Sequence, residues 1–164
     1  MGIKALRRIL LGAETTAGVA VPADTLWRGL GVLQDNREVI TPDEDIGYLS
    51  GKVRNYCPKY EAALSMSPVP ATFEQLPIIL SAGVKGVVTG VTDTGGSGKV
   101  YTFTFPTTSP NTIKTWTIEG GDDTQAEEME YSFVQSFEIS GNGGEALQMS
   151  AEWIGRQVSK CTFT

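Results

Sequence analysis

Three pairs of acids are the first candidates for chemistry, namely Asp43 with Asp45, Asp122 with Asp123, and Glu127 with Glu128. A glycoside-cleaving pair needs two carboxylates across a cleft, one of them with a pKa raised by burial. Calcium loops need oxygen ligands at alternating positions. Neighbouring acids in glycine-rich segments fit neither pattern. The chain also has no His, which removes the usual general base and a common metal ligand. We therefore expect no enzymatic activity, no metal and no cofactor.

Two further motifs have structural interpretations. The segment 95–99, GGSGK, superficially resembles a phosphate-binding loop. It lacks the required spacing and precedes an expected strand, so it predicts a hairpin turn. Cys57 and Cys161 lie far apart in the sequence and are too few for a zinc site or a disulfide scaffold. We expect free thiols, and the sequence leaves open whether the two ever meet.

The charge is unevenly distributed along the chain. The net charge is −6, yet residues 115–155 hold nine acids and no Lys or Arg. Contacts to nucleic-acid phosphates need bases, so this region is not expected to bind nucleic acid. For any single carboxylate a solvated acidic face is the favoured interpretation. The absence of bases over 41 residues also allows a surface that repels a polyanion.

The elements that must position these residues are mainly strands. The chain has 164 residues, 19 of them Gly, and its length predicts one domain over residues 1–164. One helix is expected over 72–83, with a Thr72–Gln75 capping box and Phe73, Leu76 and Leu80 on its buried face. Alternating strands are expected over 100–105, 112–118, 129–139 and 147–153. No apolar run is long enough to span a membrane.

The two longest strands have polar faces opposite their apolar faces. In 129–139 the apolar face holds Met129, Tyr131, Phe133, Phe137 and Ile139. The opposite faces carry acids and hydroxyls but no base or aromatic ring, both of which a nucleic-acid platform would need. These polar residues are Glu130, Ser132, Ser136 and Glu138 on the first strand, and Gln148, Ser150 and Glu152 on the second.

Two segments each fit more than one kind of local structure. Residues 1–14 form a basic, apolar arm that suits a helix or a strand. Residues 34–59 are polar, and they fit a functional loop, a disordered segment, or an extended hairpin that pairs 38–40 with 52–54.

Most of the chain resembles the tail tube proteins (major tail proteins) of long-tailed bacteriophages. The resemblance rests on an ordered set of segments: ETTAGVAVPADTLWRGLGVLQDNREVITPDEDIG, ATFEQLPIILSAG, and a C-terminal half containing IEGGDDTQAEEMEY. It implies a β-sandwich or partly open barrel with one flanking helix and a long stacking loop. It also implies hexameric rings that stack into a tube for DNA passage.

The resemblance suggests roles for particular residues. The seven polar strand residues become candidates to face the lumen, where an acidic lining would let DNA slide. Candidate ring-stacking residues come from the arm and the long loop: Arg7, Arg8, Asp43, Glu44, Asp45, Lys52 and Arg54. The implied partners are further copies of the chain, tape measure, tail terminator and tail-tip proteins, and DNA in transit. The implied location is the virion tail, after assembly in the host cytoplasm.

Two other functions remain open from the sequence. A tube protein of a secretion or contractile-injection system would share the fold but pass proteins. A monomeric β-sandwich binding module would need an exposed aromatic cluster. Trp116 and Trp153 lie on apolar strand faces and are therefore expected in the core.

Overall fold

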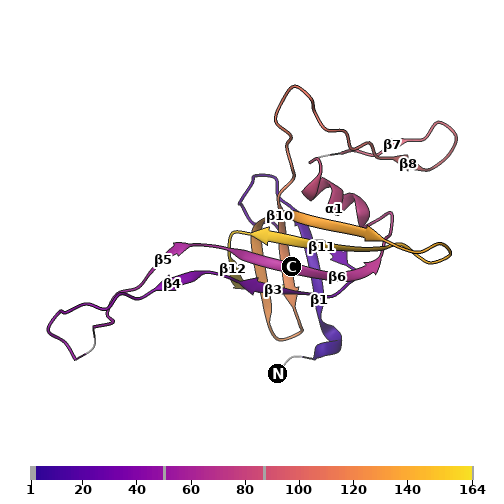
Figure 1. The fold of residues 1–164 in the computed structure, drawn as a ribbon. Coiled ribbons are helices and arrows are strands. Elements are labelled where there is room, and N and C mark those ends of the chain that lie inside the picture. The colour runs from indigo at the N-terminus through magenta and orange to yellow at the C-terminus, as the bar shows by residue number, and fades with distance from the viewer. Residues whose placement is uncertain (1–2, 50, 87, 164) are drawn as a thin grey trace.

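The computed structural model describes residues 3–49, 51–86 and 88–163, and it is mainly β, with antiparallel sheets and one α-helix (Figure 1). The strands are β1 Arg8–Ala13, β2 Thr25–Trp27, β3 Gly31–Asp35, β4 Glu38–Ile40, β5 Tyr56–Lys59, β6 Ala62–Pro70, β7 Val91–Thr92, β8 Lys99–Val100, β9 Trp116–Gly121, β10 Ala126–Ser140, β11 Gln148–Gly155 and β12 Val158–Cys161. The helices are a 3₁₀ turn, η1 Lys4–Leu6, and α1 Leu76–Gly83. Among the described residues, no helix has the length and apolar character needed to cross a membrane.

The main sheet has eight strands and is bent along β10. Its order is β2-β1-β9-β10-β11-β6-β3, with β12 also paired to β10. Residues 126–132 of β10 pair with β9 and β12, whereas residues 133–140 pair with β11. We call β2, β1, β9, β12 and 126–132 the β1 half, and β3, β6, β11 and 133–140 the β11 half.

The core lies between these two halves and beneath α1. It is built from alternate residues of the strands, and its largest fully buried side chains include Trp27, Trp153 and Met66. The indole N–H of Trp153 points at Sδ of Met66, 3.2 Å away. Trp116 is buried as well, so the expectation that Trp116 and Trp153 belong to the core is confirmed.

A single residue reverses the alternation expected for β10. Tyr131 has a φ of +55°, a left-handed conformation that is uncommon for a non-glycine residue. The pairing of β10 with β9 shifts its register there, between Met129 and Ser132. Ser132 and Val134 are consequently buried, while Tyr131 is exposed. The predicted faces of Tyr131 and Ser132 were therefore wrong.

A second bulge, between Val134 and Ser136, restores the expected faces further along β10. Such a bulge inserts one extra residue and returns the strand to its earlier alternation. Beyond it, Phe137 lies opposite the buried Ala151. Ser136, Glu138 and Ser140 therefore face away from the core.

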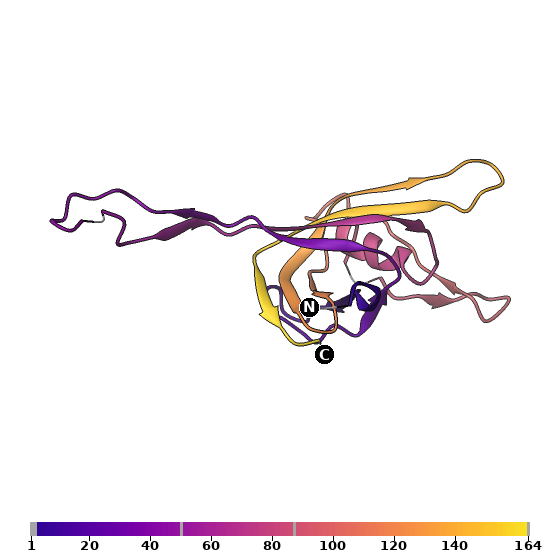
Figure 2. The ribbon, with the colours of Figure 1, turned by 90° about the horizontal axis from the view of Figure 1, so that it is seen from below.

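Residues 31–66 form one long ribbon whose outer part leaves the body of the molecule. β3 pairs with β6 in the main sheet, and β4 pairs with β5 farther out, with Glu38 opposite Lys59 and Ile40 opposite Tyr56. Both views show this hairpin extending away from the rest of the chain (Figures 1 and 2). The extended hairpin is the correct alternative for 34–59, although the expected pairing of 38–40 with 52–54 is wrong.

The helix ends at Gly83 as expected, but it begins four residues later than expected and buries a partly different face. It begins at Leu76 with Gln75 as its N-cap residue, and the backbone N–H of Gln75 donates to Oγ1 of Thr72 at 3.3 Å. The return bond of the capping box is not made. The buried face holds Ile78, Ile79 and Ala82, whereas Phe73 is 95 % exposed. The buried face packs on β10. The two elements approach closely, because a Cβ atom added at Gly83 would lie only 3.1 Å from the side chain of Val134.

Two further expectations are corrected at the N-terminus and around residue 100. Residues 8–13 are not an arm but a central strand, β1, paired with both β2 and β9. The GGSGK segment does lie in the turn between β7 and β8, which pair as a hairpin. The strand expected over 100–105 ends at Val100, however, and the chain is irregular until Trp116.

Candidate functional site

The β11 half presents a polar face on the side opposite the core. Strand pairing sets Ser136 opposite Glu152 and Glu138 opposite Ser150. Gln148 continues this face at the end of β11. On the neighbouring strand β6, the hydroxyl of Ser65 donates a 2.6 Å hydrogen bond to Oε1 of Glu152. We call the residues of this surface the polar face: Ser65, Ser136, Glu138, Ser140, Gln148, Ser150 and Glu152.

The strands of the β11 half carry acidic residues but no basic ones. None of the four strands β3, β6, β10 and β11 contains a Lys or an Arg. Five of the seven candidate lumen residues, which are Ser136, Glu138, Gln148, Ser150 and Glu152, come together on the polar face. Ser65 was missed by the sequence analysis, because only strand register reveals that it neighbours Glu152.

The remaining two candidates lie elsewhere. Ser132 is fully buried, and its hydroxyl donates to the carbonyl of Met129 at 3.2 Å. Glu130 lies at the bend of β10, where it forms an ion pair with Arg156 and accepts a 3.0 Å hydrogen bond from Nε2 of Gln157. Ser132 departs from the predicted face because the left-handed Tyr131 interrupts the alternation of the strand. Glu130 precedes that interruption and lies on the part of β10 that belongs to the β1 half.

Buried carboxylates account for part of the acidic surplus. Glu14 is 1 % exposed, and its Oε1 accepts hydrogen bonds from the N–H of Tyr131 at 2.8 Å and the hydroxyl of Thr117 at 3.2 Å. Its Oε2 accepts from the N–H of Gly18 at 2.7 Å. The buried Glu119 accepts from the N–H of Ala23 at 3.3 Å. These two carboxylates fasten the 14–24 loop to the β1 half.

Five of the seven candidate stacking residues gather at the end of the projecting hairpin. Nζ of Lys52 lies 4.0 Å from Oδ1 of Asp43, and Arg54 forms an ion pair with Glu44. The backbone N–H of Glu44 also donates to the carbonyl of Gly51 at 3.1 Å, which closes the tip. We call residues 41–55 the tip.

The other two stacking candidates, Arg7 and Arg8, are on the body of the molecule. The guanidinium of Arg8 lies 4.2 Å above the ring of Phe163, a cation–π contact. Asp122 is near Arg7, but its pKa is lowered mainly by the N–H groups of Thr124 and Gln125, which donate to it at 2.9 and 3.0 Å. The two arginines therefore do not belong to the same surface as the tip.

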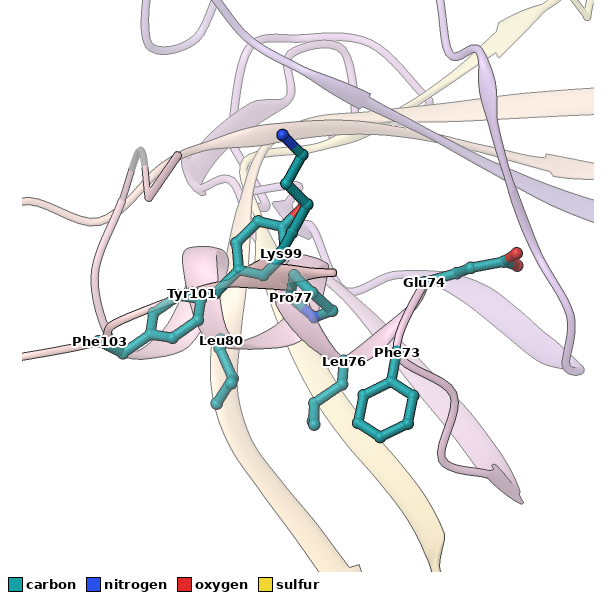
Figure 3. Close-up of a pocket in the computed structure, with 8 residues that line it drawn as sticks. All are labelled: Phe73, Glu74, Leu76, Pro77, Leu80, Lys99, Tyr101 and Phe103. Atoms are coloured by element: carbon teal, nitrogen blue, oxygen red, sulfur yellow. The ribbon is translucent and has the colours of Figure 1, made fainter. Parts of the chain in front are cut away.

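An apolar groove lies between α1 and the segment that follows β8. It has a volume of roughly 650 Å³. Figure 3 shows Phe73, Leu76 and Leu80 projecting on one side of the helical segment, with Tyr101 and Phe103 beside it. Sequence analysis missed this α1 groove. The available signal was the helix itself, which has more apolar positions than one buried face needs.

No metal-binding cluster is found within residues 3–49, 51–86 and 88–163. In this part of the chain, no three His, Cys, Asp or Glu side chains are grouped to hold a metal ion. Cys57 and Cys161 are both free thiols and half-buried. Burial, reinforced by the charge of Glu119, raises the pKa of the Cys161 thiol to about 11, so this thiol is protonated and unreactive at neutral pH.

No protein-family profile matches this sequence, and no curated protein matches it.

Proposed function

We propose that this chain is the structural subunit of a bacteriophage tail tube, in which hexameric rings stack around a channel that carries DNA during ejection. In this proposal the bent sheet is the sandwich-like, partly open barrel of that family. The observation that carries the proposal is the polar face, an exposed strand surface with carboxylates and hydroxyls and without a base.

The chemistry of the polar face suits a channel for DNA. Duplex DNA carries about one negative charge per 1.7 Å of its axis. Lysines and arginines would bind its phosphates and release counterions, which would hold the duplex in place. Glu138 and Glu152 instead repel the phosphates, and the serines offer hydrogen bonds to water. DNA would then move through a hydrated lining without adhering to it.

The open edges of the β11 half suit a ring. β3 is the last strand of the sheet order, and residues 136–140 of β10 pair on one side only, with β11, in the described structure. An unpaired strand edge is a template for pairing with another chain. Neighbouring copies that join β3 of one to β10 of the next would continue the polar face around a closed barrel.

The projecting hairpin suits the contact between rings. Its tip lies beyond the body of the molecule (Figure 2). A segment that extends this far needs a partner surface to bury its exposed apolar residues. In the proposed tube, that surface belongs to the adjacent ring.

Electron microscopy of the purified protein at high concentration tests the proposal. We expect hollow rods, and six-fold rings in end-on views. Small discrete particles at every concentration, also after addition of phage tail-tip complexes, would contradict it.

A further inference from the structure

The α1 groove is an apolar surface without a covering segment among the described residues. Its walls are Phe73, Leu76, Pro77, Leu80, Tyr101 and Phe103, with Glu74 and Lys99 at the rim. Phe73 is almost fully exposed although it is one of the largest apolar side chains. Grooves lined by apolar and aromatic side chains, with a few polar groups at the rim, are typical of binding sites.

The tip of the hairpin carries a second set of exposed apolar side chains. Ile46, Tyr48, Leu49 and Val53 are all exposed, within a segment that is otherwise polar and charged. Both views show the hairpin extending away from the body, on which α1 lies (Figures 1 and 2). The tip therefore cannot reach the α1 groove of its own chain.

The charges of the two surfaces are complementary. At the groove, Glu74 pairs with Arg28 at 3.5 Å, whereas Lys99 has no carboxylate partner in the described part of the chain. At the tip, Lys52 and Arg54 neutralise two of the three acids. Asp45 makes no ion pair among the described residues, so the tip retains one exposed negative charge and the groove rim one positive charge.

We propose that the α1 groove receives Tyr48 and Leu49 from the tip of a second copy of this chain, with Asp45 directed toward Lys99. This inference rests on the proposed tube function and supplies the receiving surface for the hairpin. In a stack the contact is heterologous, with the tip of each copy in the groove of the next, so that it repeats from copy to copy. A reciprocal exchange of tips between two copies would close a dimer instead.

Disulfide cross-linking between two variants tests the contact directly. Both native cysteines are first replaced, Cys57→Ser and Cys161→Ser. One preparation then carries Leu49→Cys and the other Phe73→Cys, and the two are mixed and oxidised. The control pair combines Leu49→Cys with Leu26→Cys, on the exposed side of β2. We expect the first pair to cross-link at least about tenfold faster, because docking raises the effective concentration of the two thiols.

The same samples are inspected for rods, which separates the two proposals. Rods without preferential cross-linking of positions 49 and 73 would overturn the groove assignment and leave the tube function standing. Preferential cross-linking without rods would support the contact and contradict the tube. Neither rods nor cross-links would overturn both. A Phe73→Glu variant should abolish stacking without changing the melting temperature, since this side chain makes little contact with the core.

Discussion

The backbone N–H of Tyr131 donates a 2.8 Å hydrogen bond to Oε1 of Glu14, across 117 residues of sequence. This bond holds the residue at which β10 adopts a left-handed conformation and bends from one half of the sheet to the other. Glu14 is therefore a structural residue of the bend, despite its place at the start of a loop rich in Thr and Gly.

Replacing Glu14 should destabilise the fold. Both carboxylate oxygens of Glu14 accept hydrogen bonds from a backbone N–H. A Glu14→Gln substitution replaces one of these oxygens with an NH₂ group, so two donors face each other and a buried donor is left unpaired. We expect a loss of about 2 kcal/mol in the free energy of unfolding, measured by urea denaturation. Glu127→Gln, at an exposed position on β10, is the control and should unfold like the parent protein.

Substitutions at Tyr131 should rank by their tolerance of positive φ. Glycine adopts this conformation freely, while a β-branched residue is strained by roughly 1–2 kcal/mol. We expect Tyr131→Val to unfold at lower urea concentration than Tyr131→Gly. Both variants lose the same ring, and the strain of Val at positive φ must exceed the entropy that Gly loses on folding for this order to appear. The reverse order would contradict a strained, left-handed bend.

Glu128 should make stability depend on pH. Its pKa is raised, first by burial and then by Glu119, Glu130 and Glu14; Glu119 is its direct partner across β9 and β10. The folded state therefore binds the proton more tightly than the unfolded state, and this carboxyl destabilises the fold above its raised pKa. The penalty disappears as the pH falls below the ordinary value of about 4.3. Glu128→Gln should melt higher than the parent protein at pH 7 and like it near pH 3.5, measured by calorimetry against Glu127→Gln.

Reversing the charge of the polar face should slow the ejection of DNA through the proposed channel. We expect Glu138→Lys and Glu152→Lys to assemble normally but to retard DNA ejection, because each added base can bind a phosphate. The delay should shrink at higher salt, where counterion release contributes less. Glu145→Lys, in the turn before β11, makes the same charge change away from the polar face. Equal ejection rates for all three variants would place the polar face outside the channel.

Removing the tip should separate folding from stacking. Ile40 and Tyr56 are paired, so an Asn-Gly turn can replace residues 41–55 with a two-residue hairpin connection. We expect an unchanged melting temperature and no rods in electron micrographs. A matched variant replaces 93–98 in the same way between the paired Thr92 and Lys99, and it should still form rods.

The sequence predicted much of the strand content but misplaced faces wherever a distant contact decides them. Nothing near Tyr131 in the sequence indicates a left-handed residue, because its hydrogen-bond partner is Glu14. The end of the helix at Gly83 was predicted correctly and its start was not, and Phe73, Leu76 and Leu80 line a groove. Both faces of α1 are apolar, so periodicity alone could not decide which one is buried.

On the polar face too, alternation along one strand was predicted from the sequence, whereas pairing between distant strands was not. Alternation beyond the second bulge correctly grouped Ser136 with Glu138, and Gln148 with Ser150 and Glu152. The pairing of β11 with β6, which adds Ser65, depends on strand register and was not accessible. The clean alternation of 101–105 predicted a strand that is absent, because no neighbouring strand lies there to pair with it.

The central position of β1 has a consequence for synthesis of the chain. Arg8 pairs with Gly121 and Ala13 with Trp116, so β1 meets one of its two partner strands only after more than 100 further residues have been synthesised. Ile9 and Leu11, which belong to the buried core, stay unburied until β9 emerges, and β9 is in turn flanked by β10. Non-local pairing of this kind slows folding and exposes apolar surface to aggregation. The β1 half is therefore expected to fold only after β9 and β10 have left the ribosome.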